Sequence, residues 1–136
     1  MKEVIMKAKE DIRIKKGHYW IFSNELENVD TTIPAGSIVQ VKDSRGGIIG
    51  TGFFNPHSLI AVRLIVKGEE PLSKNFILEG IDNAYAYRKR FGLRKFGRMC
   101  FGEADAMPGL VIDRYGDYVV VDILTAGMDA LKDDIL

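Results

Sequence analysis

Four carboxylates are spaced through one short stretch of the chain, in which turn-forming residues flank a brief apolar run. A pair of carboxylates can act as general acid and base, and a larger set of oxygen ligands can bind a hard cation such as Ca²⁺. Two hypotheses for the stretch are therefore an acid/base catalytic site and a metal-binding site. The four residues are Glu103, Asp105, Asp113 and Asp117.

The secondary structure expected around these acids separates them. A strand over 110–115 would alternate its side chains, so that Val111 and Asp113 lie on the side opposite Leu110. A calcium loop needs acids at short regular spacing with a closing glutamate, which the stretch from Asp113 to Asp122 does not provide. We therefore predict turn-capping acids, with no catalytic and no metal-binding residue. A hydrolase that loses its activity on Asp113→Asn substitution stays open as an alternative.

The composition is that of a soluble globular protein, with 136 residues, 46% hydrophobic and 28% charged. We expect a cytoplasmic protein and no membrane association, because no run of about 18 apolar residues and no signal-peptide pattern is present. Cys100 is the single cysteine, which excludes an internal disulfide and a cysteine-based zinc site. We predict that it fills the core.

The N-terminal half shows short alternating segments that are typical of strands. We predict strands over 4–6, 12–14, 37–43, 48–54 and 59–66, and a helical turn over 19–25 that buries Trp20 and Phe22. The loop over 7–11 connects the first two, and 44–47 forms a hairpin turn. Several short strands with glycine-rich turns favour a small barrel.

The composition changes at 68–73, where we place a domain boundary because Pro71 cannot continue a strand ladder. Beyond it, the spacing of apolar residues predicts a helix from an N-cap at Ser73 to Phe91. Strands over 98–101, 110–115 and 118–124 and a helix from Thr125 follow. The fold class is thus α+β: a small mixed β-barrel over 1–70, then an incomplete helix-plus-antiparallel-meander domain over 71–136.

Two groups of basic residues could bind phosphate, although the formal net charge is zero. The alternatives are a solvated strand edge for the first group and a solvated helix end for the second. Tyr19, Phe53 and Phe54 are candidates for stacking on bases, with core packing favoured. We expect Arg63 to point toward Asn55 or the turn that contains it. The first group comprises Arg13, Lys15, Lys16, His18 and Arg45; the second comprises Arg88, Lys89, Arg90 and Arg94, an unpaired cluster with Lys95 and Arg98.

Three motifs together resemble one family: KGHYWIFS at 16–23, GTGFFNPHS at 50–58 leading to IAVR at 60–63, and the series from Glu103 to Asp117. They are similar to the N-terminal part of class I S-adenosylmethionine-dependent methyltransferases that modify carbon five of cytosine in large-subunit ribosomal RNA. The resemblance implies a PUA domain, which is a small RNA-binding pseudobarrel, over 1–70 and the start of the family's central α/β domain over 71–136.

The resemblance also implies that the cofactor loop, the Asp-Pro-Pro-type motif and the nucleophilic cysteine follow the central domain. We therefore expect a chain that recognises structured RNA, holds no S-adenosylmethionine itself and is inactive alone. A chain that ends on an apolar residue within a predicted helix favours a piece of a longer protein. The alternative is a complete stand-alone RNA-binding module, and the reading frame past Leu136 distinguishes the two.

Overall fold

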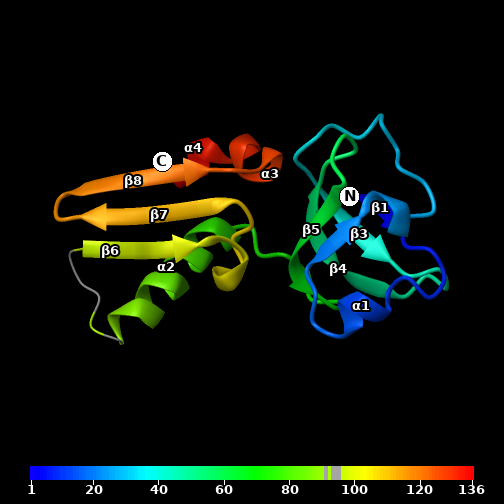
Figure 1. Ribbon diagram of the computed structural model, residues 1–136, viewed down its shortest axis with the longest axis horizontal. Helices are drawn as coiled ribbons and strands as arrows, with labels where there is room; N and C mark the ends of the chain where they lie inside the picture. The colour runs from blue at the N-terminus through cyan, green and yellow to red at the C-terminus, as the bar shows by residue number, and fades with distance from the viewer. Residues whose placement is uncertain (91, 93–95) are drawn as a thin grey trace. The chain divides into compact units, whose positions relative to one another are not determined.

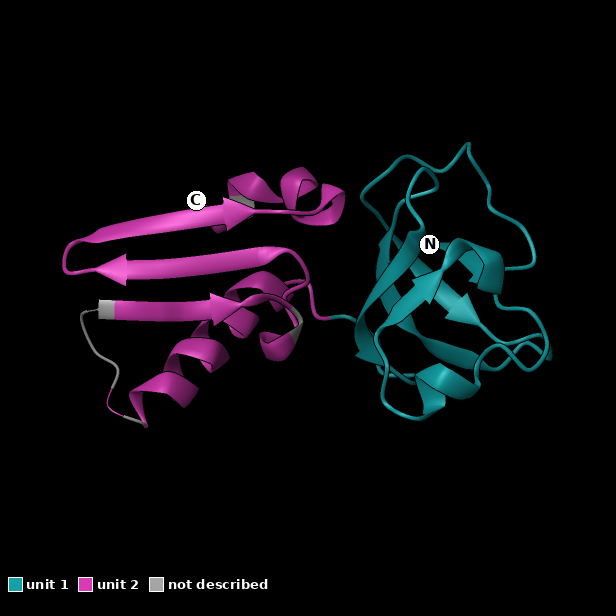
Figure 2. Cartoon of the chain, viewed as in Figure 1, with its two compact units in different colours: residues 1–72 teal, residues 73–136 magenta. Residues whose placement is uncertain are grey.

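The computed structural model describes residues 1–90, 92 and 96–136. The chain divides into two compact units, Met1–Leu72 and Ser73–Leu136 (Figure 2). Each unit has its own β-sheet, so the α+β fold class predicted from the sequence is confirmed.

Unit 1 is built on a five-stranded sheet in the order β1-β3-β4-β5-β2 (Figure 1). β1 pairs with β3 in parallel, and the remaining neighbours are antiparallel. The sheet curls until Met6 bridges Leu26, which brings the end of β1 against the segment after β2. The strands are β1 Lys2–Ile5, β2 Trp20–Phe22, β3 Ser37–Lys42, β4 Ile48–Phe54 and β5 Ile60–Lys67.

The core of unit 1 lies inside this curled sheet. Val39 and Val41 are fully buried, whereas Gln40 and Lys42 between and after them are half-buried, as the alternation of β3 requires. Phe54 is also fully buried, so the prediction of core packing is confirmed for it. The remaining buried members include Val4, Met6, Ile14, Ile21, Leu26, Ile33, Ala61, Val62 and Leu64.

Two glycines of β4 allow β5 to lie unusually close. A Cβ on Gly52 would stand 2.8 Å from Leu64 Cα and overlap the Arg63 carbonyl oxygen. A Cβ on Gly50 would overlap the Val66 carbonyl oxygen in the same way. The backbone of β5 therefore occupies the space that side chains would otherwise fill.

The prediction of a strand over 12–14 is wrong. These residues form α1, Ile12–Lys15, in which the Lys16 N–H donates to the Ile12 carbonyl at 3.1 Å. Ile14 is buried whereas Ile12 is 51% exposed, so the two isoleucines do not share one face as alternate strand residues would. Burial of Ile14 alone suits a single helical turn that closes one end of the barrel.

The predicted helical turn over 19–25 is a strand followed by a short 3₁₀ helix, η1 Ser23–Glu25. Trp20, which we predicted in the core, is 38% exposed, and Phe22 is half-buried. Ile21 between them is completely buried. The reason is that β2 is a strand, so that neighbouring side chains alternate between core and exterior.

The outer edge of β2 is closed by two side chains. Arg13 Nη2 donates to the Trp20 carbonyl at 2.9 Å, and the Phe22 N–H donates to Glu25 Oε1 at 2.8 Å. The two side chains also pair with each other at 2.6 Å, and the Glu25 side chain is only 8% exposed. Together they satisfy backbone groups that a neighbouring strand would otherwise bind.

Unit 2 consists of one long helix, a three-stranded antiparallel sheet and short helices. The strand order is β6-β7-β8, and α2 contacts β6 and α4. Its elements are α2 Phe76–Lys89, β6 Phe96–Phe101, η2 Gly102–Asp105, β7 Leu110–Tyr115, β8 Tyr118–Ile123, α3 Ala126–Ala130 and α4 Lys132–Ile135.

Three predicted details of unit 2 differ from the structure. The N-cap of α2 is Asn75 instead of Ser73, whose hydroxyl accepts from the Asn75 N–H at 3.2 Å. The helix predicted from Thr125 is broken at Leu131 into α3 and α4. The strand predicted over 98–101 begins two residues earlier, at Phe96, as β6.

Replacing Glu25 with alanine should destabilise unit 1. The change leaves the Phe22 N–H and the Arg13 guanidinium without their shared acceptor, which costs about 2–3 kcal/mol of unfolding free energy. Urea unfolding followed by circular dichroism measures this. Glu27→Ala, at an exposed acid two residues away, is the matched control and should leave the midpoint unchanged. Equal midpoints for the two variants would contradict the closing role of Glu25.

Candidate RNA-binding surface

Four of the predicted phosphate-binding residues lie on or directly after α1. Burial of Ile14 anchors this single turn, and Lys15, Lys16 and His18 are exposed around it. Gly17, at φ +115°, turns the chain after Lys16 in a conformation that favours glycine. The His18 N–H then donates to the Arg13 carbonyl at 3.3 Å, so the segment turns tightly back on α1.

Arg13 differs from its neighbours because its guanidinium is held within the protein. It bonds Glu25 and the Trp20 carbonyl, and it lies 5.0 Å from the centre of the Phe22 ring. Its side chain is 34% exposed. We infer that Arg13 orders the edge of β2 and contributes positive charge to the surface beside it.

Lys15 and Arg45 belong to one electrostatic neighbourhood. Lys15 Nζ pairs with Asp11 at 2.6 Å, and this hydrogen bond is the main cause that raises the pKa of the lysine. Through their charges, Asp43 raises and Arg45 lowers the pKa of the same lysine. The exposed Arg45 can therefore extend the basic surface.

Asp43 holds the turn that carries Arg45. Its Oδ1 accepts the Gly47 N–H at 2.8 Å and the Arg45 N–H at 2.9 Å. These backbone hydrogen bonds, that of Gly47 first, lower the pKa of the Asp43 carboxyl. The turn is thus fixed by its own carboxylate, and the Arg45 side chain projects from a defined backbone.

Two further cations of unit 1 lie over aromatic rings, and the sequence analysis missed both arrangements. Lys67 Nζ lies 4.2 Å from the centre of the Tyr19 ring and donates to the Ile14 carbonyl at 3.0 Å. The Arg63 guanidinium lies 5.0 Å from the centre of the Trp20 ring. The pairing of β2 with β5 brings these residues together, and no local sequence pattern shows it.

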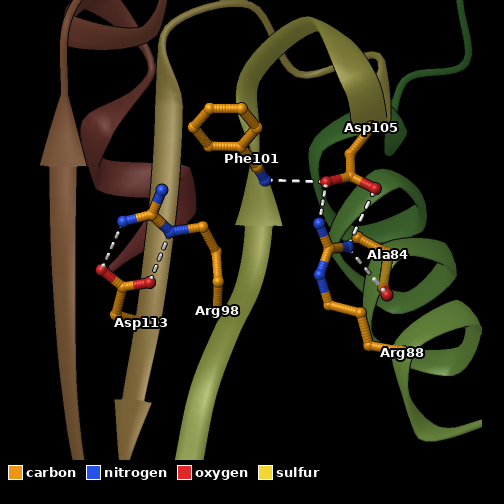
Figure 3. Close-up of polar contacts among 6 residues, drawn as sticks. All are labelled: Ala84, Arg88, Arg98, Phe101, Asp105 and Asp113. Carbon is orange, nitrogen blue, oxygen red and sulfur yellow. Dashed lines mark hydrogen bonds and ion pairs between the residues drawn. The ribbon is translucent and has the colours of Figure 1, made fainter. Parts of the chain in front are cut away.

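The second basic group does not form the unpaired cluster that the sequence suggested. Arg88 makes a two-pronged ion pair with Asp105, from Nη1 to Oδ1 at 2.9 Å and from Nη2 to Oδ2 at 2.7 Å (Figure 3). Both side chains are largely buried. The hydrogen bond to Asp105 is the main cause that raises the pKa of Arg88. Arg98 likewise pairs with Asp113 at 2.8 Å.

Lys89 and Arg90 are the exposed members of this second group. Lys89 Nζ lies 5.2 Å from the centre of the Tyr85 ring. Arg94 and Lys95 lie outside the residues that the structure describes. The carboxylates of Asp105 and Asp113 thus hold two cations of the predicted RNA track, Arg88 and Arg98.

Two of the four carboxylates that suggested chemistry, Asp105 and Asp113, have structural partners. Asp105 accepts the Phe101 N–H at 2.7 Å in addition to Arg88 (Figure 3). Asp117 is exposed in the turn between β7 and β8, and the Glu103 side chain lies outside the described part of the chain. Within residues 1–90, 92 and 96–136, no three acidic, histidine or cysteine side chains gather as metal ligands would.

Cys100 and Phe53 are buried, as predicted for core residues. Burial is the main cause that raises the pKa of the Cys100 thiol to about 11. At neutral pH the sulfur is therefore protonated, and it is a poor nucleophile.

Comparison with known proteins agrees with this geometry. Residues 4–67 match the family of PUA-like domains. Ribosomal RNA large subunit methyltransferase I of Aliivibrio fischeri is 34% identical over 128 residues, which cover 90% of this chain and 32% of that protein. The enzyme of the same name from Alteromonas mediterranea is 33% identical over 138 residues, which cover 98% of this chain and 35% of that protein.

Solved structures share the fold. A Streptococcus mutans protein, provisionally described as a SAM-dependent methyltransferase, superimposes with a TM-score of 0.80 at 20% identity. The match covers 99% of this chain and 36% of that one. A second such structure, complexed with SAH, gives the same TM-score at 19% identity.

These findings assign a domain class to unit 1, which has the fold and sequence of a PUA-like domain. The chain as a whole is homologous to large-subunit ribosomal RNA methyltransferases, which confirms that level of the predicted resemblance. It spans about a third of the length of the curated relatives it matches. Among the described residues, no helix is both long and apolar enough to cross a membrane.

Replacing Arg88 with methionine should destabilise unit 2 because Asp105 loses its largely buried counter-ion, at a cost of about 2–3 kcal/mol in unfolding free energy. Chemical denaturation measures the loss. Lys89→Ala, at an exposed neighbour, is the control, and its unfolding free energy should equal that of the unmodified protein. A stable Arg88→Met variant with weakened RNA binding would instead assign Arg88 to RNA contact.

Proposed function

We propose that this chain is the RNA-recognition part of an S-adenosylmethionine-dependent methyltransferase that modifies carbon five of a cytosine in large-subunit ribosomal RNA. The observation that carries the proposal is the basic α1 turn, which lies on a PUA-like domain within a chain similar in sequence to large-subunit ribosomal RNA methyltransferases. Units 1 and 2 correspond in this proposal to the PUA domain, over about 1–70, and the start of the central domain.

Electrostatic attraction to phosphate would supply most of the RNA affinity. Lys15, Lys16 and Arg45 are exposed point charges near one end of the barrel. Lys15 pairs with the largely buried Asp11, but the lysine side chain is itself 65% exposed, so RNA phosphates can reach its ammonium group. His18 adds an exposed ring beside them and, when protonated, a further charge.

In this proposal the second basic group, on unit 2, also contacts RNA. Lys89 and Arg90 are exposed at the end of α2, and Arg94 follows in the chain. Arg13 and Arg88 belong to the proposed set as well, but their guanidinium groups are already bonded to Glu25 and Asp105. We therefore expect the exposed lysines to carry more of the RNA affinity than these two arginines.

Methyl transfer would require parts of the relatives that this chain does not span. The glycine-rich segment around Gly50 and Gly52 does not fit a cofactor, because the backbone of β5 fills the space above both glycines. Cys100 does not fit the nucleophile, since it is buried and its pKa of about 11 keeps it protonated. The chain's own contribution is thus to bind and orient RNA.

Replacing both Lys15 and Lys16 with alanine should weaken RNA binding and flatten its salt dependence. Each lost phosphate contact reduces the slope of log K against log salt concentration by about 0.7–0.9. Filter binding with large-subunit ribosomal RNA over a series of salt concentrations measures both effects.

The matched control removes the same charge from unit 2, by alanine at the exposed Lys74 and Lys132. This control should retain the original slope. If the Lys15/Lys16 variant and the unmodified protein give superimposable curves, α1 is not the RNA-binding surface.

The chain alone should bind ribosomal RNA without methylating it. Cys100 is too buried and protonated to act as the nucleophile, and the β4 glycines leave no space for a cofactor. Incorporation of labelled methyl groups from S-adenosylmethionine is the measurement. Fusion to the remaining two thirds of the Aliivibrio fischeri relative should restore transfer, with 5-methylcytidine detected by nucleoside mass spectrometry. Methylation by the chain itself would refute the proposed division of roles. A different methylated nucleoside from the fusion would refute the proposed cytosine product.

A further inference from the structure

Tyr19 is an aromatic residue with a fixed backbone and an exposed ring. Its carbonyl accepts the Leu64 N–H at 2.9 Å, which ties it to β5 at the start of β2. The side chain is nevertheless 40% exposed. The core of unit 1 is filled by other residues, Phe54 and Ile21 among them, so packing of the interior does not account for the ring.

Lys67 fixes the position of this ring. Its ammonium group lies 4.2 Å from the ring centre and donates to the Ile14 carbonyl at 3.0 Å. The contact therefore links the ring to α1, although 48 positions of sequence separate Lys67 from Tyr19. Partial burial, which lowers the pKa of Lys67, accompanies this arrangement. A ring held by its backbone and by a cation loses little freedom when a ligand stacks on it.

The surroundings of Tyr19 are those that a nucleotide requires. Lys15, Lys16 and His18 are exposed within four residues of it and offer charge to phosphate groups. An aromatic ring beside such cations stacks on unpaired bases of any identity, because every base has a π-face. A paired duplex offers no such base, since its bases remain stacked on each other.

We propose that Tyr19 is a stacking site for one unpaired base of the bound RNA, with Lys67 as the residue that positions its ring. This inference rests on the proposed function, in which RNA docks on the α1 surface, and it adds the class of RNA that the surface prefers. Single-stranded loops or ends should bind more tightly than duplex of the same sequence.

The test uses the whole 136-residue chain and two probes: a short fluorescein-labelled RNA strand, and the same strand annealed to its complement. Loss of one base stack lowers affinity by about tenfold. Tyr19→Ala and Tyr19→Leu should therefore bind the single strand about tenfold more weakly and leave duplex affinity and salt slope unchanged. Tyr19→Phe, which keeps the ring, should bind like the unmodified protein.

Tyr118→Ala is the matched control, because Tyr118 is 79% exposed on β8 of unit 2. This variant should bind both probes with the affinity of the unmodified protein. Lys67→Met should weaken binding of the single strand, and Lys67→Arg should restore it by returning a cation to the ring. The Leu and Phe variants separate stacking from packing, since both retain apolar bulk but only Phe retains the π-face.

Two failures are distinguishable. If the unmodified protein binds neither probe, the proposed function itself fails. If it binds both probes with salt dependence while Tyr19→Leu matches Tyr19→Phe on the single strand, RNA docks without stacking and the inference about Tyr19 is overturned.

Discussion

The ion pair between Arg13 and Glu25 is the contact on which the proposed RNA surface depends. It closes the outer edge of β2 by bonding the Trp20 carbonyl and the Phe22 N–H. The same pair ties α1, which carries Arg13, to the 3₁₀ turn that carries Glu25. Without it, the β2 edge would present unsatisfied groups, and α1 would lose one of the contacts that hold it against β2. The Arg13 guanidinium, which the sequence alone assigns to RNA binding, thus also holds the fold together.

Several arginine side chains and the lysines of α1 have different roles in this chain. Arg13, Arg88 and Arg98 each form an ion pair with a carboxylate from a distant part of the sequence. Their planar guanidinium groups can satisfy several acceptors at once, which suits contacts within the fold. Lys15 and Lys16 remain at the surface as compact charges on flexible stems. Formal neutrality therefore hides exposed positive charges, among them Lys15 and Lys16 on and directly after α1.

The sequence predicted the strands well because alternation is a local property. The segments at β3, β4, β5, β7 and β8 were found within one or two residues of their ends. The failures came where distant contacts decide. Ile12 and Ile14 alternate like strand residues, yet closure of the barrel needs only Ile14. Arg88 looked unpaired because Asp105, its partner, lies 17 positions away and is brought near by folding. The contact of Lys67 with Tyr19 was invisible for the same reason.

The close approach of β4 and β5 has a use beyond this protein. Gly50 and Gly52 sit under backbone atoms, so no rearrangement of a neighbouring side chain could make room for a Cβ there. Any chain that adopts this strand spacing must leave the same two positions without side chains, however far its surface has diverged. A Gly-x-Gly pair in the second strand of a hairpin, followed by a long apolar strand, is therefore a physically grounded search pattern for barrels of this type whose other motifs have been lost.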